Sequence, residues 1–274
     1  MSDSPPPKYV LWPYTPSLPG GIVAAIIMSS LFLFHTYKLI RHRTWFCIPF
    51  VVGALCESIG YSARAAAHND TVSTRPYIIQ STLILLAPIL FAASVYMILG
   101  RMVRRTASTD YSVIRVAWVT KIFVGGDVLC FMVQGAGAGL LVSASTASGF
   151  KRGENVILGG LVLQILLFGF FVVVAAVWHV RLRNQPTAEA ATIKWEGLMA
   201  KLYAASGCIM LRNVFRVVEY GMGSDGYLIT HEWPIYVFDF LLMVATLGVS
   251  VCWYGADIQR RGRKGDVELS AARV

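Results

Sequence analysis

Charged residues are scarce in this sequence of 274 residues. They make up 14% of it, whereas a soluble domain contains about 25%. Hydrophobic residues make up 56%, and the mean hydropathy is +0.60. No interval between the apolar segments is long enough to form a soluble core. The composition therefore excludes an ordinary soluble protein and predicts a chain whose surface faces lipid.

Motifs of several enzyme and pump classes are also missing. The sequence has no Gly-x-x-x-x-Gly-Lys-Ser/Thr loop, no Asp-Lys-Thr-Gly run, no Gly-x-Ser-x-Gly elbow and no Cys-x-x-Cys pair. Its histidines divide between the two expected sides of the membrane, so three of them cannot share one zinc ion; they are His35, His42, His68, His179 and His231. We therefore expect no enzymatic activity, no catalytic residue, no metal and no cofactor.

Seven apolar segments are each long enough to cross a bilayer, which takes about 20 residues per helix. They cover residues 20–40, 45–67, 77–100, 117–142, 155–178, 198–220 and 234–254. We predict an all-α membrane protein with a seven-transmembrane helix bundle at 20–256, a disordered Pro-rich lead-in at 1–19 and a basic tail at 257–274. The lead-in lacks the basic region of a signal peptide, so the first apolar segment is expected to remain in the protein.

The basic residues are distributed unevenly between the two sets of loops. One set, together with the tail, holds 16 Lys and Arg residues, and the other holds 4. Because cytosolic loops are enriched in Lys and Arg, we predict an N-terminus outside and a C-terminus in the cytosol. The sequon Asn69-Asp70-Thr71 then lies outside. The net charge of +9 reflects this topology, so we expect no nucleic-acid partner, and the tail at 260–264 is expected to contact anionic lipid.

Ionisable residues lie within several apolar segments, where each costs about 2.5–3.5 kcal/mol. Two triplets, Glu57/Tyr61/Arg64 and Arg212/Arg216/Glu219, have the spacing i, i+4, i+7, which places each on one helix face. We predict that these faces point into the bundle and gather mostly in its outer half. The candidate binding residues are Glu57, Tyr61, Arg64, Gln80, Asp127, Gln134, Gln164, Arg212, Arg216, Glu219, His231, Glu232 and Asp239.

Other intramembrane features favour helix packing. The acids and bases within the segments nearly cancel, so a neutral network that only fixes packing is an alternative interpretation. Lys121 is also expected to point into the bundle, near the cytosolic side. The Gly135–Gly139 pair forms a Gly-x-x-x-Gly motif and Gly159-Gly160 opens another segment, which predicts close helix contact, with a hinge or a dimer contact as alternatives. Pro88 predicts a kink in its helix.

Several motifs together resemble one known family. Glu57-Ser-Ile-Gly-Tyr61-Ser-Ala-Arg64 resembles a signature of the fungal lipid-translocating exporter (RTA-like) family. So do, in order, Tyr77-Ile-Ile-Gln80, Leu86-Ala-Pro88, Tyr96, Gly126-Asp127, Gln134-Gly-Ala-Gly137, Gly159-Gly160, Gln164, Phe215-Arg216-Val-Val-Glu219, His231-Glu232, Tyr236 and Asp239. The resemblance implies a fungal protein with seven spans. It also implies export or flipping of sphingoid long-chain bases, resistance to toxic amphiphiles or, in one branch, porphyrin uptake.

The leading hypothesis is therefore a plasma-membrane translocator of amphiphilic lipids: a sphingoid base, a phospholipid or a toxic amphiphile. The substrate would use a polar intramembrane pocket open to the outer half, and the expected partners are membrane lipids or amphiphilic small molecules. Carboxylates would pair with an amine, while Arg212 and Arg216 would keep those carboxylates ionised or bind a phosphate headgroup. A seven-transmembrane lipid receptor or sensor without transport, and a passive scramblase, are the alternatives.

Overall fold

Helices account for all the regular structure in the part of the chain that the computed structural model describes, which is residues 14–68, 74–144, 146–222 and 226–254. The long helices are α1 (Leu18–His42), α2 (Ile48–Ala67), α3 (Thr74–Arg105), α4 (Val116–Ser143), α5 (Ala147–Asn184) and α7 (Trp195–Gly221). The shorter ones are α6 (Ala188–Ala191), α8 (Tyr227–Thr230), α9 (Trp233–Ile235) and α10 (Leu241–Ser250), with a π-helical turn at Tyr236–Phe240 and 3₁₀ turns at Trp45–Cys47, Thr109–Tyr111 and Val251–Trp253. Asn69, the tail at 257–274 and most of the lead-in lie outside the described residues.

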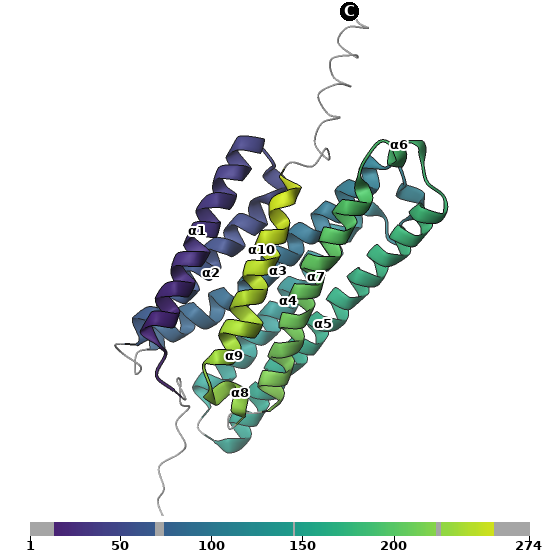
Figure 1. Ribbon diagram of the computed structural model, residues 1–274. Coiled ribbons are helices and arrows are strands. Elements are labelled where there is room, and N and C mark those ends of the chain that lie inside the picture. The colour runs from purple at the N-terminus through teal and green to yellow at the C-terminus, as the bar shows by residue number, and fades with distance from the viewer. Residues whose placement is uncertain (1–13, 69–73, 145, 223–225, 255–274) are drawn as a thin grey trace, which may run out of the picture.

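The long helices run side by side in one bundle (Figure 1). Helix α2 packs against α1 and α3, α4 packs against α3 and α5, and α7 packs against α3, α5 and α10. Helix α1 begins at the end of the bundle where α8 and α9 lie, whereas α10 ends at the opposite end. One end of the bundle therefore holds α8 and α9 and is called here the α8/α9 end. The last residues of α10 lie at the opposite end.

Local sequence explains where several helices begin and end. Proline stands in the first turn of α1, α2 and α9, where its missing N–H group costs no helical hydrogen bond. Thr146 caps α5 by accepting a hydrogen bond from the Gly149 amide. Helix α1 ends at Arg43, which adopts a left-handed conformation with φ 51°.

Six stretches of the described chain are helical, long and apolar enough to cross a membrane. They are Leu18–His42, Trp45–Ala67, Arg75–Arg105, Val116–Ser143, Ser148–Asn184 and Trp233–Trp253. The chain is therefore an integral, multi-pass membrane protein. Helix α7 is not among the six because it carries several charges, although its 27 residues reach about 40 Å at 1.5 Å per residue. The predicted seventh crossing remains a prediction.

Helix α5 is longer than the sequence suggested. The apolar segment at 155–178 predicted its membrane part, but the helix has 38 residues, or about 57 Å. A hydrocarbon core of about 30 Å covers only part of that length. The Thr146 cap extends the helix at one end, and at the other it continues to Asn184, so α5 projects beyond the apolar segment at both ends.

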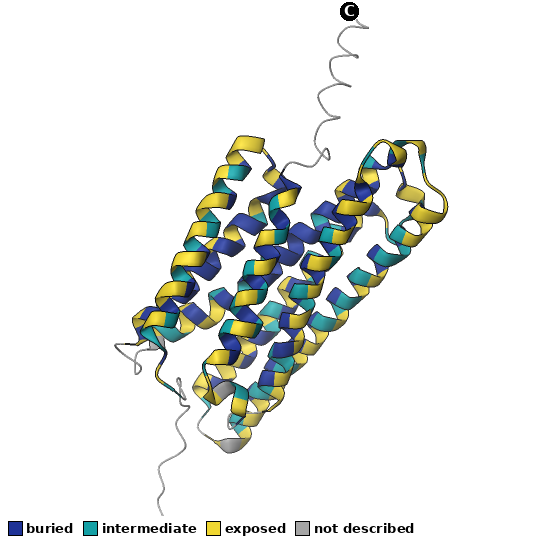
Figure 2. Cartoon of the chain, in the orientation of Figure 1, coloured by how far each residue is buried: buried dark blue, intermediate teal, exposed yellow. Residues whose placement is uncertain are grey.

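The exposed surface of the bundle is apolar along much of its length. Exposed positions follow the outer faces of the helices in Figure 2. Ile26, Leu33, Met132 and Leu166 have exposed fractions of 60–65%. Such a surface would promote association in water, but lipid chains solvate it.

Glycines bring α4 and α5 into close contact, though not the pair expected. A Cβ atom on Gly135 or Gly139 would meet no described atom within 4 Å. One on Gly137 would lie 2.9 Å from the Ile157 nitrogen, and one on Gly160 would lie 3.2 Å from the Cys130 carbonyl oxygen. The prediction that Gly135 and Gly139 make a close helix contact is thus wrong within the described chain, because the contact falls on the face that carries Gly137.

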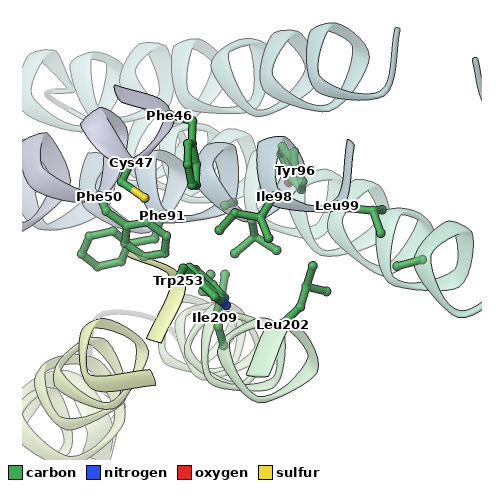
Figure 3. Close-up of a cluster of buried hydrophobic side chains, with 14 of the residues drawn as sticks. Phe46, Cys47, Phe50, Phe91, Tyr96, Ile98, Leu99, Leu202, Ile209 and Trp253 are labelled. Atoms are coloured by element: carbon green, nitrogen blue, oxygen red, sulfur yellow. The ribbon is translucent and has the colours of Figure 1, made fainter. Parts of the chain in front are cut away.

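Aromatic and aliphatic side chains form a large cluster in the interior of the bundle, part of which Figure 3 shows. Phe50 of α2 stacks on Phe91 of α3 and meets Trp253, with ring centroids 5.3 Å apart in both pairs. Leu202 and Ile209 of α7 belong to the same cluster. The same cluster includes Tyr61 of α2 and Ile84 and Tyr96 of α3.

Candidate polar site within the bundle

Four charged side chains form a continuous chain of ion pairs between α7 and the π turn, called here the ion-pair chain. The Nε atom of Arg212 donates to Oδ1 of Asp239 at 2.6 Å, and Arg216 donates to the other oxygen of Asp239. The Nη1 atom of Arg216 donates to Oε2 of Glu219 at 2.9 Å. Arg212 and Asp239 have 0% exposed side chains. Two cations and two anions pair within the bundle, so the ion-pair chain as a whole carries no net charge.

A π-helical turn supplies Asp239. The turn at Tyr236–Phe240 lies between α9 and α10. A π turn fits an extra residue into one helical turn and often marks a functional site. The register of side chains therefore changes between α9 and α10, and Asp239 stands at that change, facing both arginines of α7.

Pro88 provides a further partner for the ion-pair chain. Because Pro88 has no N–H group, the carbonyl of Ile84 lacks the intrahelical donor that would come from four residues later. The Nη2 atom of Arg212 donates to this carbonyl at 3.0 Å. Pro88, the residue predicted to kink α3, thus leaves free a buried acceptor that helps to hold Arg212.

The predicted polar face of α2 meets this network. Glu57 and Tyr61 are both 0% exposed, and Glu57 lies within electrostatic range of Asp239, Arg212 and Arg216. Among the described residues, the two carboxylate oxygens of Glu57 have no hydrogen-bond partner. The same is true of the Tyr61 hydroxyl. Glu57 is therefore a buried acid beside an ion-pair chain that is already neutral without it.

A second cluster ties the residues before α1 to the α8/α9 end. We call Tyr14, Ser17, Arg64, Glu232 and Tyr236 the N-terminal clasp. Arg64 donates to the Tyr14 hydroxyl and to a Glu232 oxygen, each at 2.8 Å, and to the Tyr236 hydroxyl at 3.3 Å. The Ser17 amide donates to both Glu232 oxygens at 3.0 Å. The end of the expected lead-in thus lies against α2 and α9.

Charge and hydrogen bonding determine the ionisation of Glu232. Partial burial alone would raise the pKa of its carboxyl group. The Ser17 amide and the Arg64 guanidinium outweigh that effect and hold the pKa of Glu232 below its ordinary value. Glu232 is therefore ionised at neutral pH and can bind both donors.

Asp127 lies in a separate buried pair. The Tyr96 hydroxyl of α3 donates to Oδ2 of Asp127 at 2.8 Å. Phe171 of α5 packs on the Tyr96 ring, with centroids 4.5 Å apart. No hydrogen bond or ion pair among the described residues joins Asp127 to the ion-pair chain, so the predicted site divides here.

The three candidate glutamines are buried but do not join the charged groups. Gln134 of α4 donates to Gln164 of α5 at 2.9 Å, which bridges these helices next to the Gly137 contact. Gln80 of α3 is 7% exposed, and its Oε1 atom has no partner among the described residues. The glutamine pair fits a packing role, because its hydrogen bond joins two helices within the membrane, while Oε1 of Gln134 has no partner among the described residues.

Two polar residues lie away from the interior. Lys121 is exposed, with its ammonium 5.3 Å from the Trp118 ring centroid, so the prediction that it points into the bundle is wrong. It lies near the start of α4, where a long aliphatic stem lets the charge reach the membrane boundary. His231 is also exposed and stacks on Tyr227 at 3.8 Å, apart from the ion-pair chain.

Sequence reasoning missed several partners of the charged groups. Tyr96 and Tyr236 were part of the family motifs, and a buried tyrosine usually brings its hydroxyl to a partner, but neither was chosen as a candidate. Tyr14 stood in a segment expected to be disordered, and the Ile84 carbonyl carries no side-chain signal. Within the described ranges, no three His, Cys, Asp or Glu residues gather as a metal site would require.

Comparison with known proteins identifies the family of this chain. The family model described as RTA1 like protein matches residues 50–261, a range that includes the ion-pair chain, Glu57, Arg64 and the Asp127 pair. The chain belongs to the RTA1-like family. The resemblance inferred from the residue motifs is thereby confirmed, and no solved structure matches the chain.

Curated relatives within the RTA1-like family come from Saccharomyces cerevisiae. Protoporphyrin uptake protein 1 is 39% identical over 201 residues, which cover 73% of this chain and 65% of that protein. Protein RTM1 is 36% identical over 220 residues, covering 79% and 70%. The sphingoid long-chain base transporter RSB1 is 22% identical over 302 residues, covering 94% and 76%. The chain thus spans slightly less than two thirds of the first of these relatives, and the names of two of them describe uptake or transport.

Proposed function

We propose that this RTA1-like chain is a plasma-membrane translocator of amphiphilic lipids or lipid-like amphiphiles. The observation that carries the proposal is the ion-pair chain of Arg212, Asp239, Arg216 and Glu219, which is buried inside a membrane bundle. Fixing helix packing alone does not require charges, because small residues achieve it at lower cost. The names of two relatives, which describe protoporphyrin uptake and sphingoid long-chain base transport, support a polar path for an amphiphile.

The proposed topology has seven crossings, with the N-terminus outside and the C-terminus in the cytosol. Helix α7 is the added crossing: it packs against α3, α5 and α10. Its buried or partly buried charged residues, Arg212, Arg216 and Glu219, are paired with Asp239 or with each other. This pairing lowers the cost of placing them in lipid. The α8/α9 end is then the outer end, and the basic tail at 260–264 meets anionic lipid on the cytosolic side.

The ion-pair chain and the apolar cluster around Phe50 and Trp253 suggest a path for the substrate. A headgroup enters the outer half, where Glu57, Tyr61 and the ion-pair chain lie, while its hydrocarbon tail stays in lipid. The carboxylates pair with an amine, and the arginines pair with a phosphate or carboxylate of the substrate. The apolar cluster around Phe50, Phe91 and Trp253 closes the inner half in this arrangement. The remaining candidates, Gln80, Asp127, Gln134, Gln164 and His231, would act along or beside this path.

Replacement of Arg216 tests the proposal. Arg216→Ala removes the link between Asp239 and Glu219, and breaking one partner of a buried pair costs about 3–5 kcal/mol. We expect movement of a labelled long-chain base between liposome leaflets to fall at least tenfold. Arg181→Ala is the matched control, since Arg181 is exposed and lies outside the ion-pair chain, donating to the Tyr111 carbonyl at 3.1 Å.

The outcomes separate the alternatives. Normal expression with lost movement supports a polar path through the ion-pair chain. Lost expression supports a network that only fixes helix packing. Unchanged movement by a folded Arg216→Ala protein contradicts the proposed path, and saturable binding without movement by the wild type favours a lipid receptor or sensor.

A further inference from the structure

The charges around Glu57 do not balance if Glu57 is ionised. The ion-pair chain holds two arginines and two carboxylates and is already neutral. The other cations predicted for the interior are engaged elsewhere: Arg64 pairs with Glu232 at the α8/α9 end, and Lys121 is exposed. Glu57 is thus the surplus acid of this region of the bundle.

The surroundings of Glu57 also lack hydrogen-bond donors for a carboxylate. Both of its oxygens are buried and have no partner among the described residues. The charged groups in range are Arg212 and Arg216 from α7 and Asp239 from the π turn. On α2 itself, Cys56 is adjacent and Tyr61 follows one turn later. Next to Glu57 on α2, Ser58 bonds to Ser29 of α1 and Gly60 lies against Ile84 of α3; neither Ser29 nor Ile84 carries a charge.

An unpaired buried carboxylate is costly, and a carboxyl group in such a place stays protonated until a cation arrives. Three further polar atoms near it are buried and unpartnered among the described residues: the Tyr61 hydroxyl, Arg212 Nη1 and Arg216 Nε. They offer one acceptor and two donors to the hydroxyl groups of an entering headgroup. The geometry is therefore complementary to a molecule with one ammonium group and one or more hydroxyls.

We propose that Glu57 is a proton-exchange site, at which a bound proton is replaced by the ammonium group of a cationic amphiphile. On entry of the ammonium ion, the O–H bond of Glu57 breaks and its proton leaves to the aqueous phase from which the amphiphile came. One positive charge replaces another, so the net charge of the site does not change. On release of the ammonium ion, Glu57 takes up a proton again. This inference rests on the proposed translocation and adds that movement of the amine is linked to protons.

Proton release on binding is the direct test. The full-length protein, purified in detergent, is titrated with a long-chain primary amine, and calorimetry in buffers of different ionisation enthalpy gives the protons released. We expect close to one proton per amine at mildly acidic pH, and an affinity that weakens toward tenfold per pH unit as the pH falls. The N-acetylated amine, which has no charge, should release none.

Variants assign the proton to Glu57. Glu57→Gln should abolish both proton release and pH dependence, whereas Glu57→Asp should retain them. Glu196→Gln is the matched control, because Glu196 is exposed in the first turn of α7. If Glu57→Gln fails to fold, infrared difference spectroscopy of the wild type replaces it, and the carbonyl band of a protonated carboxyl group should disappear when amine is added.

Each result decides a different claim. Amine binding without proton release, or with release unchanged in Glu57→Gln, overturns proton exchange but leaves translocation intact. An infrared band that persists on amine addition does the same. No amine binding by the wild type at any pH overturns both this inference and the proposed amine substrate.

Discussion

At Ile84, a backbone carbonyl becomes a ligand for an arginine because Pro88 lacks an N–H group. The Arg212 guanidinium makes this bond at 3.0 Å while it also holds Asp239. A buried hydrogen bond to a charged group contributes about 1.5–3 kcal/mol. Pro88 therefore acts on the site through another residue, by leaving free a carbonyl that positions Arg212.

Pro88→Ala should weaken this contact. The backbone amide that the substitution restores at position 88 would donate to the Ile84 carbonyl and compete with Arg212. We expect amine movement to fall severalfold although thermal stability rises or stays equal, because a helical hydrogen bond is regained. Pro76→Ala is the control, since Pro76 lies in the first turn of α3, where no amide is needed. Equal movement by both variants would show that the carbonyl does not position Arg212.

The residues also show what sequence reasoning can reach. The i, i+4, i+7 spacing predicted that Glu57 and Arg212 would face the interior, and both are 0% exposed. It did not predict that Pro88 would provide a partner for Arg212, because a freed carbonyl belongs to the backbone. Lys121 was misplaced because spacing does not tell a charge in the core from one near a helix end whose stem reaches the membrane boundary.

Among the contacts between elements, the N-terminal clasp is expected to depend on pH. The pKa of Glu232 is lowered in the folded protein, so its contribution to stability is present above the ordinary value of 4.5. That contribution is lost as the pH falls through the lowered folded value. The clasp should therefore hold residues 14–17 at neutral pH and release them in acid.

Hydrogen exchange of the Ser17 amide measures the clasp. After correction for the intrinsic effect of pH, protection should be present at neutral pH and lost below the ordinary glutamate range. Glu232→Gln should remove most of the protection even at neutral pH, since it has no charge to hold Arg64 and the Ser17 amide together. Equal protection in Glu232→Gln and the wild type at neutral pH would contradict the clasp.

Helix lengths and contacts show a similar division between what was predictable and what was not. Hydropathy located the helices, since apolar runs of about 20 residues have few alternatives in lipid. It underestimated the length of α5, because the helix continues into polar sequence at both ends. It also assigned the α4–α5 contact to Gly135 and Gly139, whereas the partner helix faces Gly137; the choice among adjacent glycines depends on helix rotation, which a glycine motif alone does not specify.

For the whole molecule, the uneven distribution of basic residues predicts one orientation. Thr146 and Thr192 are both exposed and lie in the α4–α5 and α6–α7 turns, which are expected outside and inside respectively. In intact cells, a membrane-impermeant thiol reagent should label Thr146→Cys but should label Thr192→Cys only after permeabilisation. The exposed Cys252 is replaced by Ser in both proteins. The reverse pattern would invert the topology, and labelling of both in intact cells would contradict a crossing by α5, the helix that separates the two positions.

The ion-pair chain inside the membrane bundle leads to the central claim, that the protein itself carries amphiphiles across the membrane. The most direct measurement is the initial rate at which a labelled long-chain base changes leaflets in liposomes, as a function of protein copies per vesicle. A translocator predicts a rate that rises in proportion to copy number, with Arg181→Ala equal to the wild type and Arg216→Ala near empty liposomes. A rate that stays at the level of empty liposomes at every copy number, while the protein still binds the lipid, would contradict the claim.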